Sequence, residues 1–360
     1  MHLKKISLVN YKNFESAEFE LSPQINCFVG NNGIGKTNVL DAIYYLSFTK
    51  SYFNSIDGQN IKFGESFFVL EGEFEKDNRD ELVFCGIQKG QKKAVKRNGK
   101  LYTKLQDHIG EFPLVIISPS DRDLIIEGSD VRRKFMDGVI SQFKADYLSD
   151  LMSYNKQLSQ RNALLKYFAT NRRWDEDSLL VYDEIMSELA ARIHKARKEF
   201  LEDMMPTFLE RYNSISSNEE LVKIEYISSL DEKPLAEQFL ESREKDRALQ
   251  YTSVGIHKDD LNFKLGDYPI KKFGSQGQQK TFLISLKLAQ FEYLKKLKGV
   301  TPILLLDDVF DKLDEKRVEQ IIRLVNQHYF GQIFISDTHP ERTESVVKSI
   351  NEEYKIFELK

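Results

Sequence analysis

A lysine that follows a run of glycines can neutralise phosphate oxygens, and this chain places one at Lys36 within the octapeptide G-N-N-G-I-G-K-T. The octapeptide fits the phosphate-loop pattern G-x-x-x-x-G-K-[ST] without a mismatch. Glycines allow successive backbone N–H groups to face an anion, and the Thr37 hydroxyl is a ligand for Mg²⁺. The sequence therefore predicts a nucleoside triphosphate site formed by Gly30, Asn31, Asn32, Gly33, Ile34, Gly35, Lys36 and Thr37.

Two neighbouring carboxylates complete such a site. The apolar run Ile303–Leu306 is typical of a buried strand, and it ends in Asp307 and Asp308. Phosphate-loop proteins hold Mg²⁺ with an acid in this position, so we assign Asp307 to the metal. Asp308 is placed to orient or deprotonate the attacking water, and we assign it to catalysis together with Lys36. Many buried strands end in acids, so the pair is informative only in combination with the phosphate loop.

A further anion site is predicted where G-S-Q-G-Q-Q, residues 274–279, opens a helical pattern. Ser275 and Gly277 would lie at the N-terminus of that helix, whose partial positive charge attracts anions. Alternatively, Ser275 does no more than cap the helix.

The periodicity of apolar residues predicts the helices and strands that must position these residues. An apolar run precedes the phosphate loop and a helical stretch, residues 38–46, follows it, which is the context that the motif requires. Asn98-Gly99 predicts a hairpin between residues 94–97 and 100–103. Other segments read as strands: residues 5–9, 17–21, 67–74, 81–88, 114–117, 303–306 and 332–336. Residues 277–297 and 315–328 read as helices.

The middle of the chain has helical periodicity from about residue 129 to residue 215, and Pro206 is expected to kink or end the second helix there. The long separation of Lys36 from Asp307 indicates a large insertion between two parts of one core. We therefore predict an α/β ATPase head of the P-loop type with an inserted helical lid. Its segments are residues 1–128 with the phosphate loop, 129–250 as the lid, and 251–360 with the second half of the site.

Motifs along the whole chain carry a family resemblance. Besides the phosphate loop they are L-V-N-Y-K-N-F at 8–14, S-P-S-D at 118–121, V-R-R-K-F-M-D at 131–137, Y-N-K-Q-L-S-Q-R-N-A-L-L at 154–165, G-I-H-K-D-D-L at 255–261, G-S-Q-G-Q-Q at 274–279 and L-D-D-V-F-D-K-L-D at 306–314. In this order they resemble the ABC/SMC/Rad50 ATPase heads and, more narrowly, the bacterial RecF family of DNA replication and repair proteins. The Q-R-N-A-L-L and S-Q-G-Q-Q blocks are specific to that family among its relatives. Ile256 departs from the family, which usually has proline there.

The resemblance implies a function as well as a fold. It implies ATP and Mg²⁺ as cofactors, an ATP-dependent homodimer on gapped single- and double-stranded DNA, and slow, DNA-stimulated hydrolysis. It also implies partnership with RecR and the RecA-loading machinery. Ser275 and Gly277 would contact the γ-phosphate held by the other subunit, and Asp311 and Asp314 would form the D-loop.

Two further positions follow from the resemblance. Residues around Asp121 stand where related ATPases have the Q-loop. The switch position after residues 332–336 stays open between Thr338 and His339, and His339 is alternatively a surface residue that caps a helix.

Composition limits the partners and the compartment. The net charge of −4 gives no bulk electrostatic case for nucleic acid, so a DNA-binding surface must be a local patch. Cys27 and Cys85 lie in apolar surroundings and fit buried thiols in a reducing compartment. The N-terminus lacks a signal-peptide pattern and no apolar run reaches the length of a membrane span. We expect a cytoplasmic, nucleoid-associated protein without membrane contact.

Candidate DNA-binding patches each have an ordinary alternative. Cations crowd the Asn98-Gly99 hairpin, where they either contact phosphates or protect an edge strand: Lys89, Lys92, Lys93, Lys96, Arg97, Lys100 and Lys104. Lys156, Arg161 and Lys166 form a second candidate. A third, Arg132 with Arg133, is explained better by structural salt bridges. The H-K-D-D segment, residues 257–260, is a metal site or, preferably, a hydrogen-bonded turn.

Two rival classes remain to be weighed. A head that regulates a nuclease requires long coiled coils, which a chain of 360 residues does not accommodate. A transporter ATPase requires a glutamate after Asp307 and a glutamine near Asp121, and this chain has Asp308 and no such glutamine.

Overall fold

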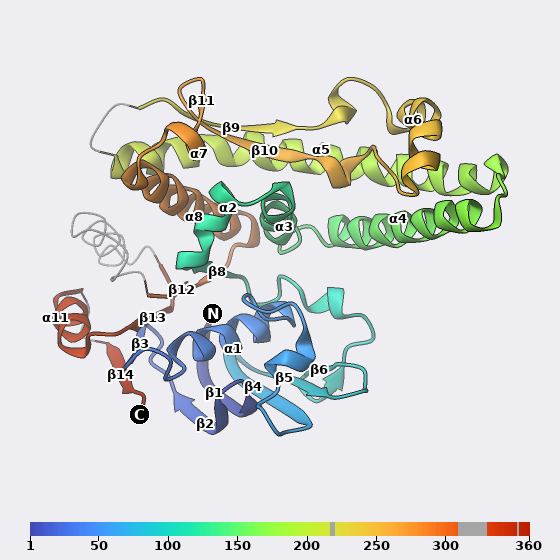
Figure 1. Ribbon diagram of the computed structural model, residues 1–360. Helices are drawn as coiled ribbons and strands as arrows, with labels where there is room; N and C mark the ends of the chain where they lie inside the picture. Colours follow the sequence, from blue (N-terminus) through green and yellow to red (C-terminus); the bar gives the residue numbers. More distant parts are fainter. Residues whose placement is uncertain (217–219, 309–329, 351–352) are drawn as a thin grey trace. The chain divides into compact units, whose positions relative to one another are not determined.

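The computed structural model describes residues 1–216, 220–308, 330–350 and 353–360, and it divides into two compact units (Figure 1). Unit 1 consists of Met1–Asp121 and Lys280–Lys360, and unit 2 of Arg122–Gln279. Each unit is described by itself. No helix of the described ranges is both long and apolar enough to cross a bilayer.

An antiparallel sheet in unit 1 has the strand order β2-β1-β4-β5-β6-β7. Its strands are β1 (His2–Tyr11), β2 (Phe14–Glu20), β4 (Phe67–Lys76), β5 (Arg79–Gln88), β6 (Ala94–Arg97) and β7 (Lys100–Leu101). Asn98 and Gly99 both have positive φ angles, 49° and 79°, so the predicted hairpin forms and pairs Arg97 with Lys100. The alternating apolar residues of β1, β4 and β5 point into the core.

A parallel sheet in unit 1 has the order β14-β3-β13-β12-β8. Its strands are β3 (Ile25–Val29), β8 (Leu114–Ile117), β12 (Ile303–Leu306), β13 (Ile333–Asp337) and β14 (Tyr354–Glu358). Four of them are buried along their full length, as expected for strands covered on both faces, and the runs predicted at 114–117 and 303–306 form strands with those bounds.

Helix α1 (Lys36–Phe48) packs against both sheets, and its buried side chains join the strands in one hydrophobic core. Helix α11 (Pro340–Ile350) packs against β3 and β14. Gln332 fastens the start of β13 to β1, because its side chain accepts from the Leu3 N–H at 2.7 Å and donates to the Leu3 carbonyl at 2.7 Å. Cys27 and Cys85 are buried thiols, and burial raises the pKa of each to about 12.

Unit 2 combines helices with a small sheet. The helices are α2 (Asp123–Ile126), α3 (Ser129–Ile140), α4 (Ala145–Asn171), α5 (Glu176–Ile215), α6 (Leu235–Leu249) and α7 (Ile270–Phe273), and α8 (Gln276–Lys298) starts here and continues into unit 1. The sheet has the order β11-β10-β9, formed by β9 (Val222–Ile227), β10 (Asp260–Leu265) and β11 (Tyr268–Pro269). Short 3-10 turns lie at Ser229–Asp231 and Ile256–Lys258 in this unit, at Asp57–Asn60 and Leu105–His108 in unit 1, and at Pro119–Arg122, where the chain passes from unit 1 to unit 2.

Two features of unit 2 differ from the sequence expectations. The unit extends to Gln279, beyond the lid expected to end at residue 250, because β10 pairs with β9 and therefore belongs to the same sheet. Helix α5 continues past Pro206 to Ile215, so of the two outcomes expected at the proline, a kink or an end, the helix does not end there. The helix predicted at 315–328 lies outside the described residues.

Candidate nucleotide-binding site

The phosphate loop connects β3 to α1, and its glycines occupy conformations that other residues rarely adopt. Gly30, Gly33 and Gly35 have φ angles of 146°, 80° and 115°. A Cβ atom on Gly35 would lie 2.6 Å from Nδ2 of Asn13, so no larger residue fits there without a shift. The loop therefore needs glycine at these positions for its backbone path.

The Lys36 side chain folds back onto the start of the phosphate loop. Its ammonium donates to the carbonyl oxygens of Gly30 at 2.8 Å and Asn31 at 2.9 Å, and the side chain is almost fully buried. Both acceptors are neutral, so the positive charge of Lys36 is not cancelled by them. Phosphate oxygens placed in the loop would meet this charge together with the N-terminus of α1.

Asn13 supports the loop, and the sequence reading gave it no role. Its Nδ2 donates to the Ile34 carbonyl at 2.7 Å, and its Oδ1 accepts from Asn38 Nδ2 at 2.7 Å. Asn13 follows Lys12, which has a positive φ of 52° in the turn between β1 and β2. The sequence feature that could have revealed this role is an asparagine in a turn, because its short amide can bridge two backbone segments.

Thr37 and Asp307 meet as the two motifs predicted. The Thr37 hydroxyl donates to Asp307 Oδ1 at 2.8 Å, although the residues lie 270 positions apart in the chain. Burial raises the pKa of the Asp307 carboxyl, and the hydrogen bonds from Ser336 and Thr37 oppose that rise. A hydroxyl beside a buried carboxylate is the oxygen donor set that Mg²⁺ prefers, so these residues fit the metal.

Ser336 is a second residue that the sequence reading missed. Its hydroxyl donates to Asp307 Oδ1 at 2.8 Å and accepts from the Asp308 N–H at 2.8 Å. The sequence shows a polar residue at the end of the apolar run 332–336. Because β13 lies beside β12 in parallel register, a residue at that end of β13 reaches the end of β12. Ser336 therefore fixes the position of both acids.

Asp308 has a left-handed backbone conformation, with φ of 46°, and its side chain is partly buried. This conformation ends β12 and turns the chain directly after Asp307. The segment that follows, with the predicted D-loop residues Asp311 and Asp314, lies outside the described residues.

The predicted signature segment forms a reciprocal cap at the start of α8. The Gln278 N–H donates to Ser275 Oγ at 3.2 Å, and the Ser275 N–H donates to Gln278 Oε1 at 2.6 Å. This is a capping box, in which each side chain satisfies a backbone donor of the other residue. Gly277 lies in the first turn of the helix. The capping interpretation of Ser275 is thus correct, and its O–H remains able to donate to an anion.

The switch candidates lie at the turn from β13 into α11. The Thr338 hydroxyl and His339 Nδ1 are 2.8 Å apart, and the His339 carbonyl accepts from the Thr343 N–H at 3.0 Å. His339 is therefore exposed at the start of a helix, in agreement with the capping alternative. The preceding Asp337 is fully buried and bonds Arg342 at 2.6 Å.

Asp121, at the position expected for a Q-loop, is a buried structural anchor. It pairs with Lys287 of α8 at 2.7 Å and accepts from the Tyr52 hydroxyl at 2.8 Å. Both charged side chains are nearly inaccessible to solvent.

Several candidate DNA contacts are engaged inside the protein. Arg161 is a correction: it is 1% exposed and bonds Asp183 at 2.7 Å and Asp246 at 2.8 Å, so it cannot reach a phosphate. Its register on α4 turns it towards α5 and α6, which the sequence pattern did not reveal. Lys93 and Arg97 of the hairpin cluster pair with Asp57 and Glu81, at 2.7 and 2.8 Å. The cluster's other lysines are exposed.

The remaining candidates have structural roles in unit 2. Arg132 pairs with Asp260 at 2.6 Å, and Arg133 donates to the Asp259 carbonyl at 2.7 Å. His257 lies 2.9 Å from the Tyr154 hydroxyl and 3.1 Å from the Thr252 carbonyl, as expected for a hydrogen-bonded turn. Among the described residues no cluster of three or more histidine, cysteine and acidic side chains could hold a metal.

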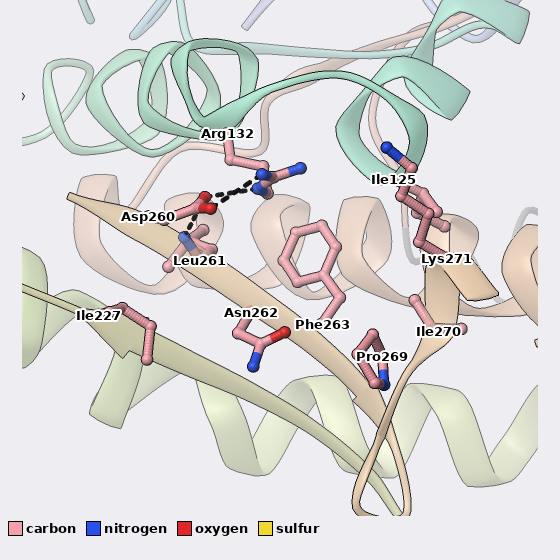
Figure 2. Close-up of a pocket in the computed structure, with 10 residues that line it drawn as sticks. All are labelled: Ile125, Arg132, Ile227, Asp260, Leu261, Asn262, Phe263, Pro269, Ile270 and Lys271. Carbon is pink, nitrogen blue, oxygen red and sulfur yellow. Dashed lines mark hydrogen bonds and ion pairs between the residues drawn. The ribbon is translucent and has the colours of Figure 1, made fainter. Parts of the chain in front are cut away.

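A pocket of 330 Å³ in unit 2 contrasts with the phosphate loop (Figure 2). Phe263, Ile270 and Ile125 supply an apolar lining, and Arg132 and Asp260 point towards each other at its side. Lys271 donates to the Ile126 carbonyl at 2.6 Å. Since the arginine and the aspartate neutralise each other, the pocket does not resemble a phosphate site.

Comparisons with known proteins agree with this geometry. Residues 2–358 match the family model described as the RecF/RecN/SMC N terminal domain. The chain is 61% identical over 359 residues to the DNA replication and repair protein RecF of Flavobacterium johnsoniae, covering 100% of both chains. It is 53% identical to RecF of Phocaeicola vulgatus, covering 99% of this chain and 96% of the relative.

Solved structures extend the similarity to three dimensions. The recombination mediator protein RecF of the RecFOR pathway, solved with ATPrS, has a TM-score of 0.89 at 31% identity and covers 100% of this chain and 96% of its own. The Smc head domain of Pyrococcus furiosus, bound to a domain of ScpA, has a TM-score of 0.57 at 15% identity, with 100% and 94% covered. The second likeness is one of fold alone. The predicted ATPase-head fold is thereby confirmed.

Proposed function

This chain belongs to the RecF family of DNA replication and repair proteins, and we propose that its nucleotide site works as a switch that closes a dimer on DNA. The observation that carries the proposal is the 2.8 Å hydrogen bond between Thr37 and Asp307, which unites the two halves of an ATP site. The identity of 61% to a RecF protein over 359 residues favours the repair class over a nuclease regulator or a transporter.

Within the site, the residues have distinct tasks. The N–H groups of the phosphate loop and the Lys36 ammonium bind the β- and γ-phosphates. Thr37 and Asp307 hold the Mg²⁺ ion, which supplies charge neutralisation at the transferred phosphoryl group. Asp308 orients the water, and its position depends on the bond from its N–H to Ser336.

The dimer supplies the rest of the site. Ser275 and Gly277 of one subunit contact the γ-phosphate bound by the other. The capping box already fixes the N-terminus of α8, where Ser275 and Gly277 lie, in one orientation. Loss of the γ-phosphate removes these contacts and lets the dimer open.

Hydrolysis is slow and stimulated by DNA. Aspartate is one methylene shorter than glutamate, so the Asp308 carboxylate lies roughly 1.5 Å further from the water than the glutamate of fast ATPases of this fold. A long-lived ATP dimer suits a cytoplasmic, nucleoid-associated protein that marks gapped DNA for RecR and the RecA-loading machinery.

Dissociation from gapped DNA tests the proposal. Asp308→Asn retains ATP, Mg²⁺ and dimerisation but loses most hydrolysis, by about 100-fold or more, so it stays on DNA longer in ATP. Asp308→Glu is the matched control and shortens residence. Salt is held fixed, because phosphate contacts make affinity steeply salt-dependent. Release that is faster in Asp308→Asn, or indifferent to nucleotide, contradicts the switch.

A further inference from the structure

An exposed phenylalanine stands at the tip of a turn in unit 1, before β4. The Glu65 N–H donates to the Lys62 carbonyl at 3.0 Å, and Gly64 has a φ of 89°, so residues 62–65 form a β-turn with Phe63 at its first central position. The Phe63 side chain is fully exposed. A phenylalanine left in water forgoes about 1.5–3 kcal/mol of burial free energy, which a partner covering the ring would recover.

The turn is held firmly at its base. The Lys62 N–H donates to the Asn10 carbonyl at 2.8 Å, and the Lys12 N–H donates to the Asn60 carbonyl at 2.8 Å. On the other side, the Lys89 N–H donates to the Ser66 carbonyl at 2.9 Å. The ring is therefore presented on a backbone anchored to β1 and to the end of β5.

Other apolar and basic side chains share this end of the antiparallel sheet. Phe53 and Ile56 are 39% and 56% exposed. Lys89 and Lys92 are exposed in the segment that follows β5, and the Lys89 ammonium donates to the Glu65 carbonyl, a neutral acceptor. We call this surface the aromatic edge, formed by Phe53, Ile56, Phe63, Lys89 and Lys92.

The outer face of the same sheet has the opposite charge. Glu71 and Glu73 of β4 are exposed there together with Phe67, and Glu18 of β2, which pairs with Lys5 at 2.8 Å, lies nearby across β1. A polyanion would be repelled by that face and attracted to the aromatic edge. The combination of exposed rings and lysines is the one that single-stranded nucleic acids recognise, since bases stack on the rings and phosphates meet the cations.

We propose that the aromatic edge is a subsite for single-stranded DNA at a junction, in which the Phe63 ring stacks on the first unpaired base. This inference rests on the proposed function and names the DNA feature that one surface reads. A continuous duplex offers no open base face, so the ring would distinguish a gap from unbroken DNA. Insertion of apolar side chains at disrupted base steps follows the same principle.

The test uses the full chain with a slowly hydrolysed ATP analogue and three DNAs at fixed salt: a gapped duplex, an unbroken duplex and a single strand. Phe63→Ser lowers affinity for the gapped and single-stranded DNAs by about 5- to 150-fold and leaves the unbroken duplex unchanged. Phe63→Trp restores binding, and its emission is quenched by single strands above the background of the one native tryptophan, Trp174.

Two controls separate the ring from charge. Leu82→Thr, which removes an apolar side chain 41% exposed on β5, leaves all three affinities unchanged. Lys92→Ser weakens binding to the gapped and single-stranded DNAs and reduces the salt slope for the single strand by about 0.7.

Failure of the subsite is distinguishable from failure of the proposed function. If the unmodified protein shows no nucleotide-dependent DNA binding, the proposed function falls and the subsite with it. If it binds but Phe63→Ser binds equally, or weakens on all three DNAs alike, the subsite alone is overturned. A loss of binding to a protein partner with unchanged DNA affinities also overturns it.

Discussion

Charged side chains are partnered differently in the nucleotide site and in the interior of unit 2. Lys36 contacts two neutral carbonyls, and Asp307 contacts two hydroxyls. In unit 2, Arg161 contacts two carboxylates, and Arg197 pairs with Asp137 at 2.9 Å and Asp259 at 2.7 Å. Both regions bury charge, but only in unit 2 does each of these cations contact carboxylates directly.

The difference separates function from architecture. A buried charge with neutral partners has attraction left for a ligand of opposite sign, whereas a charge closed by counter-charges has little. By this criterion Arg161 and Arg197 hold α4, α5 and the neighbouring turns together, whereas Lys36 and Asp307 fit the binding roles that we propose for them. Substitutions at both kinds of residue test this distinction.

The largest effect is expected at Arg161. Arg161→Met leaves Asp183 and Asp246 buried without their cation, so the free energy of unfolding of unit 2 falls by about 3–5 kcal/mol. Urea denaturation measures the loss. Adding Asp183→Asn and Asp246→Asn should recover part of it. If the Arg161→Met protein is as stable as the parent but binds DNA more weakly, the buried structural role of Arg161 is contradicted and a DNA contact is supported.

Lys36→Met is expected to lower the rate of ATP hydrolysis strongly and to change the free energy of unfolding little. Turnover falls by about 100- to 1000-fold because the cation that neutralises the phosphates is gone. The matched control is Lys287→Met, which removes a buried lysine paired with Asp121 and should destabilise the fold while the folded protein still hydrolyses ATP. Parental turnover in Lys36→Met would show the phosphate-loop assignment to be wrong.

Acid should weaken unit 2 through His257. Burial lowers the pKa of His257 to about 4 from 6.5, so the unfolded chain binds a proton between these values and the folded chain does not. Stability is therefore complete above about pH 6.5 and falls by up to about 3 kcal/mol as the pH drops to 4. Unfolding at several pH values measures this. His257→Gln should flatten the profile, and an unchanged slope would assign it to other groups.

The smallest effect is expected at the cap of α8. Ser275→Ala removes the acceptor for the Gln278 N–H and costs about 1 kcal/mol in unfolding, while Ser275→Thr keeps it. Ser275→Arg should additionally prevent the ATP-dependent dimer, measured by light scattering with a slowly hydrolysed analogue. An intact dimer in Ser275→Arg would leave Ser275 with a capping role alone.

Local patterns predicted what local physics determines. The phosphate loop, the Asn98-Gly99 turn and the buried runs at 114–117 and 303–306 follow from residue type and spacing, and each is found in place. Ser336 and Asn13 were missed because their roles depend on which strand lies beside β12 and which turn lies beside the loop. Arg161 was misjudged for the same reason: helical periodicity shows a stripe, but the carboxylates that bury an arginine come from elsewhere in the chain.

The order of the parallel sheet has a consequence for biosynthesis. Strand β3 lies between β13 and β14, and Leu3 bonds Gln332, which is 329 positions later. At about 5–20 residues per second, the ribosome needs roughly 15 to 65 seconds to make that stretch. During this time β3 lacks both of its neighbours in the parallel sheet, whereas residues 122–279 are contiguous and can fold first. A nascent chain can thus acquire its second unit before the parallel sheet that carries the phosphate loop is complete.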